Sequence, residues 1–234
     1  MSRIILPIIA SAVIGYLIGC INLAYIFSKL KGYDIRKHGS GNAGASNVII
    51  VMGKKMGVVV MAADIFKAYF AVKICVQLFS DFHLAGVIAA TAVILGHIFP
   101  FYMGFKGGKG FASLGGSILA LDMKMFLVLL IFAVVICFVT NYICFGPTSV
   151  SVIFSLAYGY FSKSLASTMI LLIAAVCIIY RHFENFKRIR EGTELKFSFL
   201  WNREAEAKRF GVKDDDGDFP FEEEEKGFEM QDDK

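Results

Sequence analysis

Long apolar blocks dominate the chain, and short polar segments separate them. Each block approaches the roughly 20 residues with which a helix crosses a bilayer, and backbone in lipid must satisfy its own hydrogen bonds, so we expect each block to be a helix. The block Ile4–Phe27 carries no charge and exceeds the roughly 7–15-residue core of a signal peptide, which favours a retained helix. The pattern predicts an all-α, polytopic integral membrane protein with about seven transmembrane helices. These are Ile4–Phe27, Met56–Phe79, Leu84–Met103, Phe111–Leu121, Met125–Phe145, Thr148–Phe161 and Leu165–Tyr180.

The polar segments indicate the orientation. With the N-terminus outside, the inner segments are 28–55, 104–110, about 141–147 and everything after 180. Lysine and arginine collect in these segments, whereas the outer turns contribute only Lys124 and Lys163. Because basic residues favour the cytoplasmic side of short loops, the C-terminus and the segments 28–55, 104–110 and 181–194 are predicted to be cytoplasmic.

Composition and charge divide the chain in two. Hydrophobic residues make up 56% of the 234 residues and charged residues only 19%, against about 25% charged in soluble domains. Residues 213–234 carry a net charge of −8, so the remainder carries +12. We therefore expect a transmembrane domain over 1–194 and an acidic, disordered cytoplasmic tail over 195–234. The five cysteines lie in apolar surroundings without metal-ligand spacing, which indicates buried thiols.

A pair of opposite charges lies inside the second predicted span. Asp64 and Lys67 are three residues apart, so they share a helical face and can pair. Ionisable groups at membrane depth are functional candidates, but the pattern favours an internal ion pair that docks this helix against its neighbours. Gly15 and Gly19 form a GxxxG motif, which indicates close packing of the first span.

The first polar segment, His38–Asn47, is rich in glycine and is predicted to open the second span. Small residues let backbone amides approach an anion, and a helix N-terminus adds its dipole. Gly39, Gly41 and Gly44 also match GxGxxG. That fingerprint requires a preceding strand, whereas an apolar helix precedes it here, so a dinucleotide site is excluded.

The second polar segment, Gly96–Gly110, contains four glycines within its last seven residues. Lys106 and Lys109 flank two of them just before the helix predicted to begin at Phe111. It is not a Walker A loop, because glycine follows Lys109 where Ser or Thr is required. The exposed amides and two ammonium groups indicate a phosphate cradle, and contact with anionic lipid headgroups is the alternative.

The third polar segment is Arg181–Glu194. If the last span continues as a helix, Asn185 shares a face with His182 and with Arg188. A basic stretch after a final span also serves as a topology anchor. Together the three segments gather Ser, Asn, Lys, His and Arg without a carboxylate cluster. That chemistry suits phosphate-bearing substrates and suits a divalent metal poorly, so we predict no metal site, no cofactor and no nucleic-acid partner.

With these motifs in order, the chain resembles the bacterial acyl-phosphate:glycerol-3-phosphate acyltransferases of the PlsY type. The resemblance covers nearly the whole chain to about Glu194, and the Asp64–Lys67 pair is similar as well. The residues that carry it are Ser40–Asn47, Gly96, His97, Pro100, Phe105–Gly110, Arg181, His182, Asn185, Arg188 and Gly192–Glu194.

The resemblance implies transfer of a fatty acyl group from acyl phosphate to the 1-hydroxyl of glycerol 3-phosphate, giving lysophosphatidic acid and phosphate for phospholipid biosynthesis. It implies a site on the cytoplasmic face of the bacterial inner membrane, amid membrane lipid. Ser40, His182 and Asn185 would be required for activity, and Glu194, Asp64 and Lys67 would be structural. The substrate-binding residues would be Gly41, Asn42, Gly44, Asn47, His97, Lys106, Gly107, Gly108, Lys109 and Arg188.

Three positions depart from the family pattern. Ile50 and Asn141 stand where the family has arginine, and Cys144 stands where it has serine. A charge-assisted hydrogen bond contributes about 1.5–3 kcal/mol, so an altered donor or acceptor is one alternative. A second alternative is a non-catalytic subunit that binds lipid phosphates, although a site without catalytic activity would not need His182 or Lys109. The base is open between His182 and the acceptor's own phosphate, and the sequence leaves the oligomeric state and the acyl-chain preference open.

Overall fold

The computed structural model describes residues 2–202, and within them the chain is helical with no strand. The longer helices are α1 (Ser2–Cys20), α4 (Lys54–Leu78), α5 (Ala85–Ile98), α6 (Phe111–Leu121), α7 (Met123–Thr140), α8 (Phe145–Phe161) and α9 (Leu165–Arg190). The shorter elements are α2 (Leu23–Leu30), α3 (Ala45–Met52) and the 3-10 helices η1 (Ile35–Lys37), η2 (Phe101–Met103) and η3 (Phe197–Leu200).

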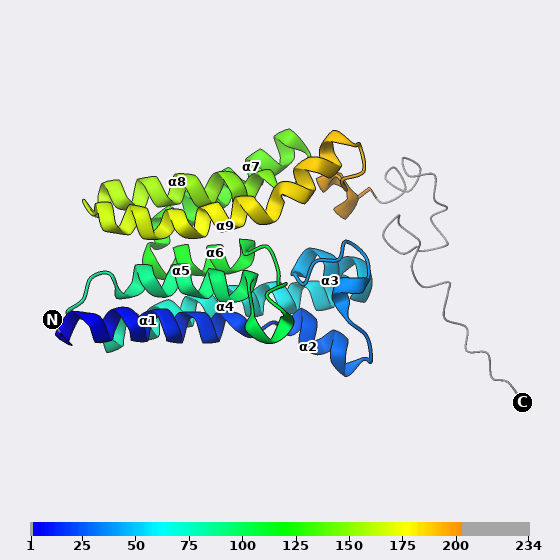
Figure 1. Ribbon diagram of the computed structural model, residues 1–234. Helices are drawn as coiled ribbons and strands as arrows, with labels where there is room; N and C mark the ends of the chain where they lie inside the picture. Colours follow the sequence, from blue (N-terminus) through cyan, green and yellow to red (C-terminus); the bar gives the residue numbers. More distant parts are fainter. Residues whose placement is uncertain (1, 203–234) are drawn as a thin grey trace, which may run out of the picture.

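The long helices lie side by side in two layers (Figure 1). One layer holds α1, α4, α5 and α6, and the other holds α7, α8 and α9; α5 packs on α9 and joins them. Successive long helices run in alternating directions, as a polytopic membrane protein requires. As a result α3, the end of α9 and the loop before α6 all lie at the end of the bundle opposite the N-terminus.

Four stretches of the described residues are long and apolar enough to cross a bilayer: Ile4–Leu30, Ala85–Met103, Met123–Thr140 and Leu165–Arg190. Helix α4 has 25 residues but carries charges such as Asp64 and Lys67, and α6 has only 11 residues. The all-helical membrane architecture is therefore confirmed, and the count of seven spans and their orientation stay predictions.

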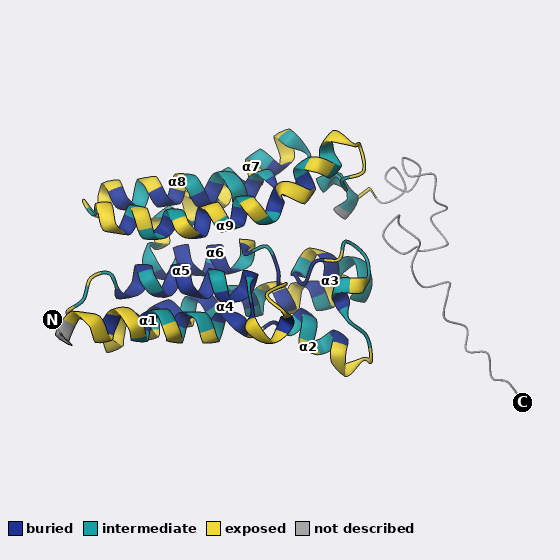
Figure 2. Ribbon diagram, viewed as in Figure 1, coloured by how far each residue is buried: buried dark blue, intermediate teal, exposed yellow. Residues whose placement is uncertain are grey.

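Helix α5 is the centre of the bundle, because 72% of its span is buried against 17% for α7. Its neighbours are α1, α4, α6 and α9, and dark blue burial is concentrated on α5 and α6 in Figure 2. Small residues allow this packing: a Cβ on Gly15 or Gly19 would collide with the α5 backbone at Ala89 and Val93. The GxxxG motif is thus a packing face, as predicted.

The first predicted span is not one continuous helix. It breaks after Cys20, and α2 begins at Leu23, where the Asn22 side chain accepts a hydrogen bond from the Tyr25 amide. The carbonyls exposed by the break are satisfied by side chains of other helices: Lys67 donates to Ile21 O at 2.6 Å and Tyr102 donates to Cys20 O at 2.8 Å. Such partners are what allow non-helical backbone at membrane depth.

The prediction that the first polar segment opens the second span is wrong. The segment opens the short helix α3, and Gly53, at φ +89°, separates α3 from α4. Ile50 therefore lies on α3, outside the long helix α4. A positive φ favours glycine and ends α3 there, which lets α3 fold back against α4.

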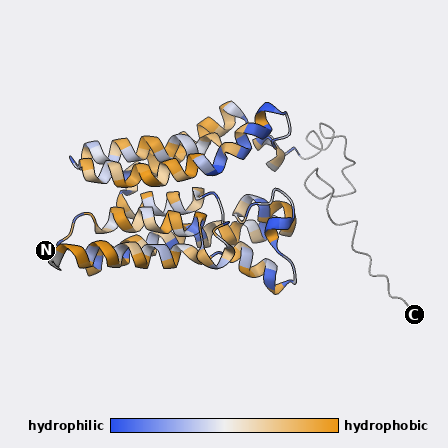
Figure 3. Ribbon diagram, in the orientation of Figure 1, coloured by the Kyte–Doolittle hydropathy of each residue, from blue (hydrophilic) through white to orange (hydrophobic). Residues whose placement is uncertain are grey.

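The last span extends further than predicted, to Arg190, and beyond it the chain continues into η3. Hydrophilic residues gather at this end of α9 and around α3, whereas the bodies of the long helices are mostly apolar (Figure 3). Residues 195–202 of the predicted tail are thus part of the described structure, and its disorder from 203 onward is a prediction that lies outside the described residues.

Candidate active site

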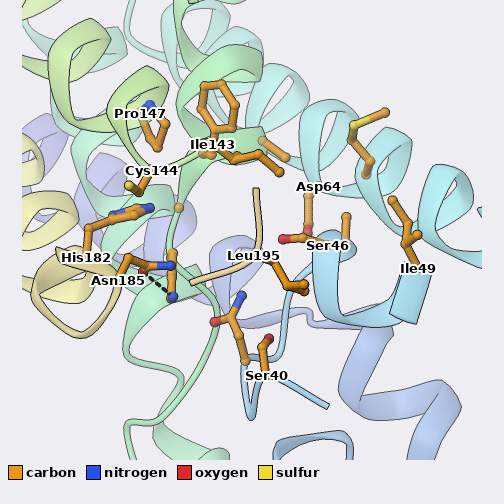
Figure 4. Close-up of a pocket in the computed structure, with 18 of the residues that line it drawn as sticks. Ser40, Ser46, Ile49, Asp64, Ile143, Cys144, Pro147, His182, Asn185 and Leu195 are labelled. Atoms are coloured by element: carbon orange, nitrogen blue, oxygen red, sulfur yellow. Dashed lines mark hydrogen bonds between the residues drawn. The ribbon is translucent and has the colours of Figure 1, made fainter. Parts of the chain in front are cut away.

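A pocket of about 400 Å³ opens at this polar end of the bundle. All three polar segments contribute to it, although they lie far apart in the sequence (Figure 4). Ten of the predicted site residues line it: Ser40, Asn42, Gly44, Asp64, His97, Lys109, His182, Asn185, Arg188 and Glu194. The other six, Gly41, Asn47, Lys67, Lys106, Gly107 and Gly108, are not among its lining residues.

Asn47 organises the first polar segment from behind the pocket. It is fully buried, and its Oδ1 accepts from the Ser40 amide at 2.7 Å while its Nδ2 donates to Ile35 O and His38 O at 3.1 and 3.0 Å. Gly39 must be glycine, because φ is +58° and a Cβ would collide with Asn47 Oδ1. Asn47 thus positions Ser40 at the pocket rather than binding there itself.

Asn42 also lines the pocket. Its Oδ1 is buried and has no hydrogen-bond partner within residues 2–202. Leaving a buried acceptor unpaired costs about 1–3 kcal/mol, so this oxygen is suited to receive a hydrogen bond from a ligand.

The loop 104–110 folds back over the end of α5. The amides of Gly107 and Gly108 donate to Ile98 O and His97 O at 2.9 and 3.1 Å. A Cβ on Gly108 would collide with the His97 ring. These glycines are therefore needed for the close fold of the loop, and their amides are already occupied.

The two lysines of this loop have different surroundings. Lys109 is half-buried in the pocket wall, and its ammonium donates to Asn185 Oδ1. Burial, followed by the nearby positive charge of Arg188, lowers the pKa of Lys109 to about 8. Lys106 is exposed and does not line the pocket. Sequence spacing alone could not distinguish them.

The third polar segment continues α9, so His182 and Asn185 share one buried face as expected. Nδ1 of His182 lies 2.7 Å from Ile178 O. A carbonyl oxygen only accepts, so Nδ1 carries the proton and Nε2 of the neutral ring is an acceptor. In Figure 4 this ring reaches from α9 into the pocket.

Asn185 and Arg188 are held by the carboxylate of Glu194. Asn185 Nδ2 donates to Oε1 at 2.5 Å, and Arg188 Nε donates to Oε2 at 2.6 Å. With Lys109 bound to the other side of Asn185, these four side chains form a continuous chain of contacts, which we call the rim network. Glu194 neutralises Arg188, and Lys109 has only a neutral partner.

Asp64, Lys67 and His97 form a second group, which we call the buried cluster. Lys67 Nζ lies 2.7 Å from Asp64 Oδ1 and 3.0 Å from His97 Nδ1, which itself lies 3.4 Å from Asp64 Oδ1. All three side chains are almost fully inaccessible to solvent. The cluster connects two parts of the site. Lys67 donates to Ile21 O at the break between α1 and α2, and the His97 ring lies directly under Gly108 of the loop 104–110.

Several residues outside the predicted site set also hold or line the site. Arg36 donates to Met103 O at 2.6 Å and Arg181 donates to Gly107 O at 3.2 Å, so both anchor the second polar segment. Ser46 and Lys196 line the pocket. Arg181 and Ser46 belong to motifs already recognised, but Lys196 lies where the sequence predicts a disordered tail.

The three departures from the family pattern are placed differently. Ile50 and Cys144 line the pocket, so the arginine and serine expected there are missing from its wall. Asn141 is not among the lining residues; it lies at the end of α7 with φ +60° and contacts η3.

Comparison with known proteins identifies the family of this chain. The profile of the family described as glycerol-3-phosphate acyltransferase matches residues 9–192. The chain is 40% identical over 189 residues to the glycerol-3-phosphate acyltransferase of Thermoanaerobacter sp. (strain X514), covering 80% of this chain and 94% of the relative. It is 36% identical over 191 residues to that of Bacillus subtilis (strain 168), covering 80% and 96%.

Two solved structures share the fold. Both are crystal structures of PlsY (YgiH), an integral membrane glycerol 3-phosphate acyltransferase. The glycerol 3-phosphate form has a TM-score of 0.75 at 31% identity, and the lysophosphatidic acid form has 0.73 at 30%. Each alignment covers 82% of this chain and 96% of that chain.

Proposed function

The chain belongs to the glycerol-3-phosphate acyltransferase family, and we propose that it transfers a fatty acyl group from acyl phosphate to the 1-hydroxyl of glycerol 3-phosphate. The products are lysophosphatidic acid and inorganic phosphate. The observation that carries the proposal is the convergence of Ser40, Lys109, His182 and Asn185 on one pocket. Solved relatives in glycerol 3-phosphate and lysophosphatidic acid forms support the acceptor and the product.

The pocket is suited to both parts of such a substrate pair. Lys109, Arg188 and the Ser40 loop form a polar, basic side for phosphate groups. Ile65 on α4 and Phe126 and Leu130 on α7 form an apolar side. Because most of α7 is exposed on the outside of the bundle, this side would lead the acyl chain toward lipid.

Catalysis would depend on positioning and electrostatics. An acyl phosphate is a mixed anhydride and is already activated. The acceptor's 1-hydroxyl oxygen attacks the acyl carbonyl carbon, the carbon–oxygen bond to phosphate breaks, and phosphate leaves with the bonding electrons. Lys109 and Arg188 would stabilise the charge that develops on the leaving group, and no covalent acyl-enzyme is needed.

The hydroxyl proton has two possible acceptors. His182 Nε2 is a base aimed at the pocket, and the phosphate of the acceptor is the other. Asn42 Oδ1, buried without a partner within residues 2–202, is suited to orient an acceptor hydroxyl.

The donor is tested with purified full-length protein in detergent, by offering acyl phosphate, acyl-CoA and acyl carrier protein separately with glycerol 3-phosphate. We expect lysophosphatidic acid only from acyl phosphate, and its loss in His182→Ala. Transfer from acyl-CoA instead would contradict the proposed donor. Glycerol 3-phosphate binding without transfer from any donor would favour the non-catalytic reading. Chelators should not reduce activity.

A second candidate, the same reaction with an altered donor or acceptor, is favoured by Ile50 and Cys144 in the pocket wall. Ile50→Arg separates the two candidates. If the protein uses the family's substrates, the added cation should lower KM or raise kcat. A folded Ile50→Arg variant that loses activity toward glycerol 3-phosphate would favour the altered substrate.

The cytoplasmic orientation is tested by labelling single cysteines in a background without the native five. Lys106→Cys should react only from the cytoplasm, and Lys163→Cys only from outside. Both sites are exposed. Lys106 lies in the loop between α5 and α6 and Lys163 in the turn between α8 and α9, and these two connections are at opposite ends of the bundle (Figure 1). Labelling of Lys106→Cys from outside would reverse the orientation.

A further inference from the structure

A short segment beyond the family-matched region forms part of the pocket wall. The family profile ends at residue 192, yet Leu195, Lys196 and Phe199 all line the pocket. In Figure 4 the Leu195 side chain lies between Asn185 and Asp64, above Ser40. We call residues 195–201 the closing segment.

Asn141 holds this segment through its backbone and its side chain. Its carbonyl accepts from the Phe197 amide at 2.7 Å, its Oδ1 accepts from the Ser198 amide at 2.9 Å, and its Nδ2 lies 3.3 Å from Ser198 Oγ. Two amides at the start of η3 are thus satisfied by one residue. Asparagine also tolerates the left-handed conformation at φ +60° better than arginine does.

Aromatic packing holds the other end of the segment. Trp201 stacks on Phe138 of α7 at 5.5 Å between ring centroids, and Phe197 meets both rings edge to face at 5.1 and 5.2 Å. Such pairs each contribute about 0.5–1.5 kcal/mol. The closing segment is therefore fixed against α7 at two points, one on either side of Phe199.

The charges around the pocket indicate what the segment contributes. The charged residues that line the pocket are Asp64, Lys109, Arg188, Glu194 and Lys196. Asp64 pairs with Lys67, and Glu194 pairs with Arg188. Within residues 2–202, neither Lys109 nor Lys196 forms an ion pair. The proposed reaction brings two phosphate groups to a pocket with two such ammonium groups.

We propose that Lys196 binds a substrate phosphate, and that Asn141 positions it by holding the closing segment. This inference rests on the proposed function. It accounts for two departures together. Ile50 leaves the pocket wall without the arginine that the family pattern has there, and Asn141, which lies outside the wall, anchors a segment that brings Lys196 to it. The side chain of Lys196 makes no capping hydrogen bond in η3, so its replacement should leave the segment docked.

The primary test compares Lys196→Met with Lys187→Met in the purified full-length protein. Lys187 is a matched control, because it lies nearby on α9, is exposed and does not line the pocket. We expect Lys196→Met to raise KM for one phosphate substrate about tenfold with kcat little changed, because a charge-assisted hydrogen bond is lost. Separate titrations of glycerol 3-phosphate and acyl phosphate identify which substrate it serves. Lys196→Arg should retain a near-normal KM, and Lys187→Met should not change it.

The positioning role of Asn141 is tested by coupling. Asn141→Ala should raise the same KM as Lys196→Met, and the double variant should be no worse than the more affected single variant, because both remove one contact. Ile50→Arg in the Lys196→Met background should recover part of the loss. Additive effects of Asn141→Ala and Lys196→Met, or an unchanged KM for both substrates in Lys196→Met, would overturn the inference.

A binding measurement distinguishes this inference from the proposed function. Inorganic phosphate should raise the Tm of the wild-type protein in detergent more than that of Lys196→Met, whether or not acyl transfer is detected. If the wild type transfers acyl groups while Lys196→Met shows a normal KM and a normal phosphate effect, the inference fails and the proposed function stands. If no donor supports transfer but the phosphate effect still depends on Lys196, the proposed function fails and the phosphate site stands.

Discussion

The buried cluster and the rim network both reach the same pocket, but they are held in different ways. Asp64, Lys67 and His97 lie on the packed helices α4 and α5, and all three side chains are nearly inaccessible. In the rim network, Arg188 and Glu194 keep 21% and 13% of their side chains exposed, and their partners come from a loop, a helix end and the chain that follows it. The comparison separates charges that hold helices together from charges that are available to meet a ligand.

The physical difference is the cost of an unpaired charge. Removing one partner of a buried ion pair leaves the other in a medium that solvates it poorly. At the rim, water replaces part of a lost interaction, so the same change should affect substrate orientation more than folding. The contrast predicts that stability and activity respond to different residues.

Breaking the buried cluster should give the largest effect. Asp64→Asn leaves Lys67 without its carboxylate partner, and we expect the free energy of unfolding to fall by about 3–5 kcal/mol. Chemical denaturation in detergent measures it. The double variant Asp64→Asn/Lys67→Met removes both charges and should be more stable than Asp64→Asn alone. Equal stability of the two variants would show that the pair is not coupled.

Breaking the rim network should instead affect catalysis. Glu194→Gln weakens the bonds to Asn185 and Arg188, and kcat/KM should fall roughly ten- to a hundredfold, because charge-assisted hydrogen bonds contribute about 1.5–3 kcal/mol. Tm should change far less than in Asp64→Asn. Glu191→Gln is the matched control, since Glu191 is exposed and its contact to Lys187 is 3.8 Å. A large decrease of Tm in Glu194→Gln would show that the rim network stabilises the fold as the buried cluster does, and would contradict the prediction.

The pH dependence should report Lys109, whose pKa is lowered to about 8. Its ammonium is present below that pH and is lost as pH rises, so kcat/KM for glycerol 3-phosphate should fall roughly fivefold between pH 8 and 9. Phosphate monoesters, with a second pKa of about 6, stay fully ionised over this range. Lys109→Arg should move the decline to higher pH. A decline at the same pH in that variant would assign it to another group.

The smallest effect is expected at the other lysine of the loop. Lys106 is exposed and outside the pocket, so Lys106→Ala should change KM less than about twofold, as surface charges contribute about 0–1 kcal/mol. Lys109→Ala, measured in the same assay, should raise KM for glycerol 3-phosphate much more. An equal increase of KM in the two variants would instead support the prediction from the sequence that both lysines bind substrate.

Some features of both networks could be predicted from the sequence because they depend on local spacing. The Asp64–Lys67 pair and the shared face of His182 and Asn185 follow from helical periodicity once the segments are known to be helices. The link from Lys67 to the break after Cys20 could not be predicted in this way. It depends on which helices meet, and the break itself is stabilised by Asn22 within an otherwise apolar block.

The apolar pattern and the ordered motifs by themselves determined a helical membrane protein of this family, since hydrocarbon demands internally bonded backbone and the motif residues are explicit in the chain. Only the tertiary structure decided that α3 is separate from α4, that Lys109 rather than Lys106 lines the pocket, and that Lys196 reaches it. Each of these depends on a loop conformation: a positive φ at Gly53, the fold of 104–110 over His97, and the contacts of Asn141 with η3. Loop paths are fixed by non-local contacts, and a single sequence does not display those contacts.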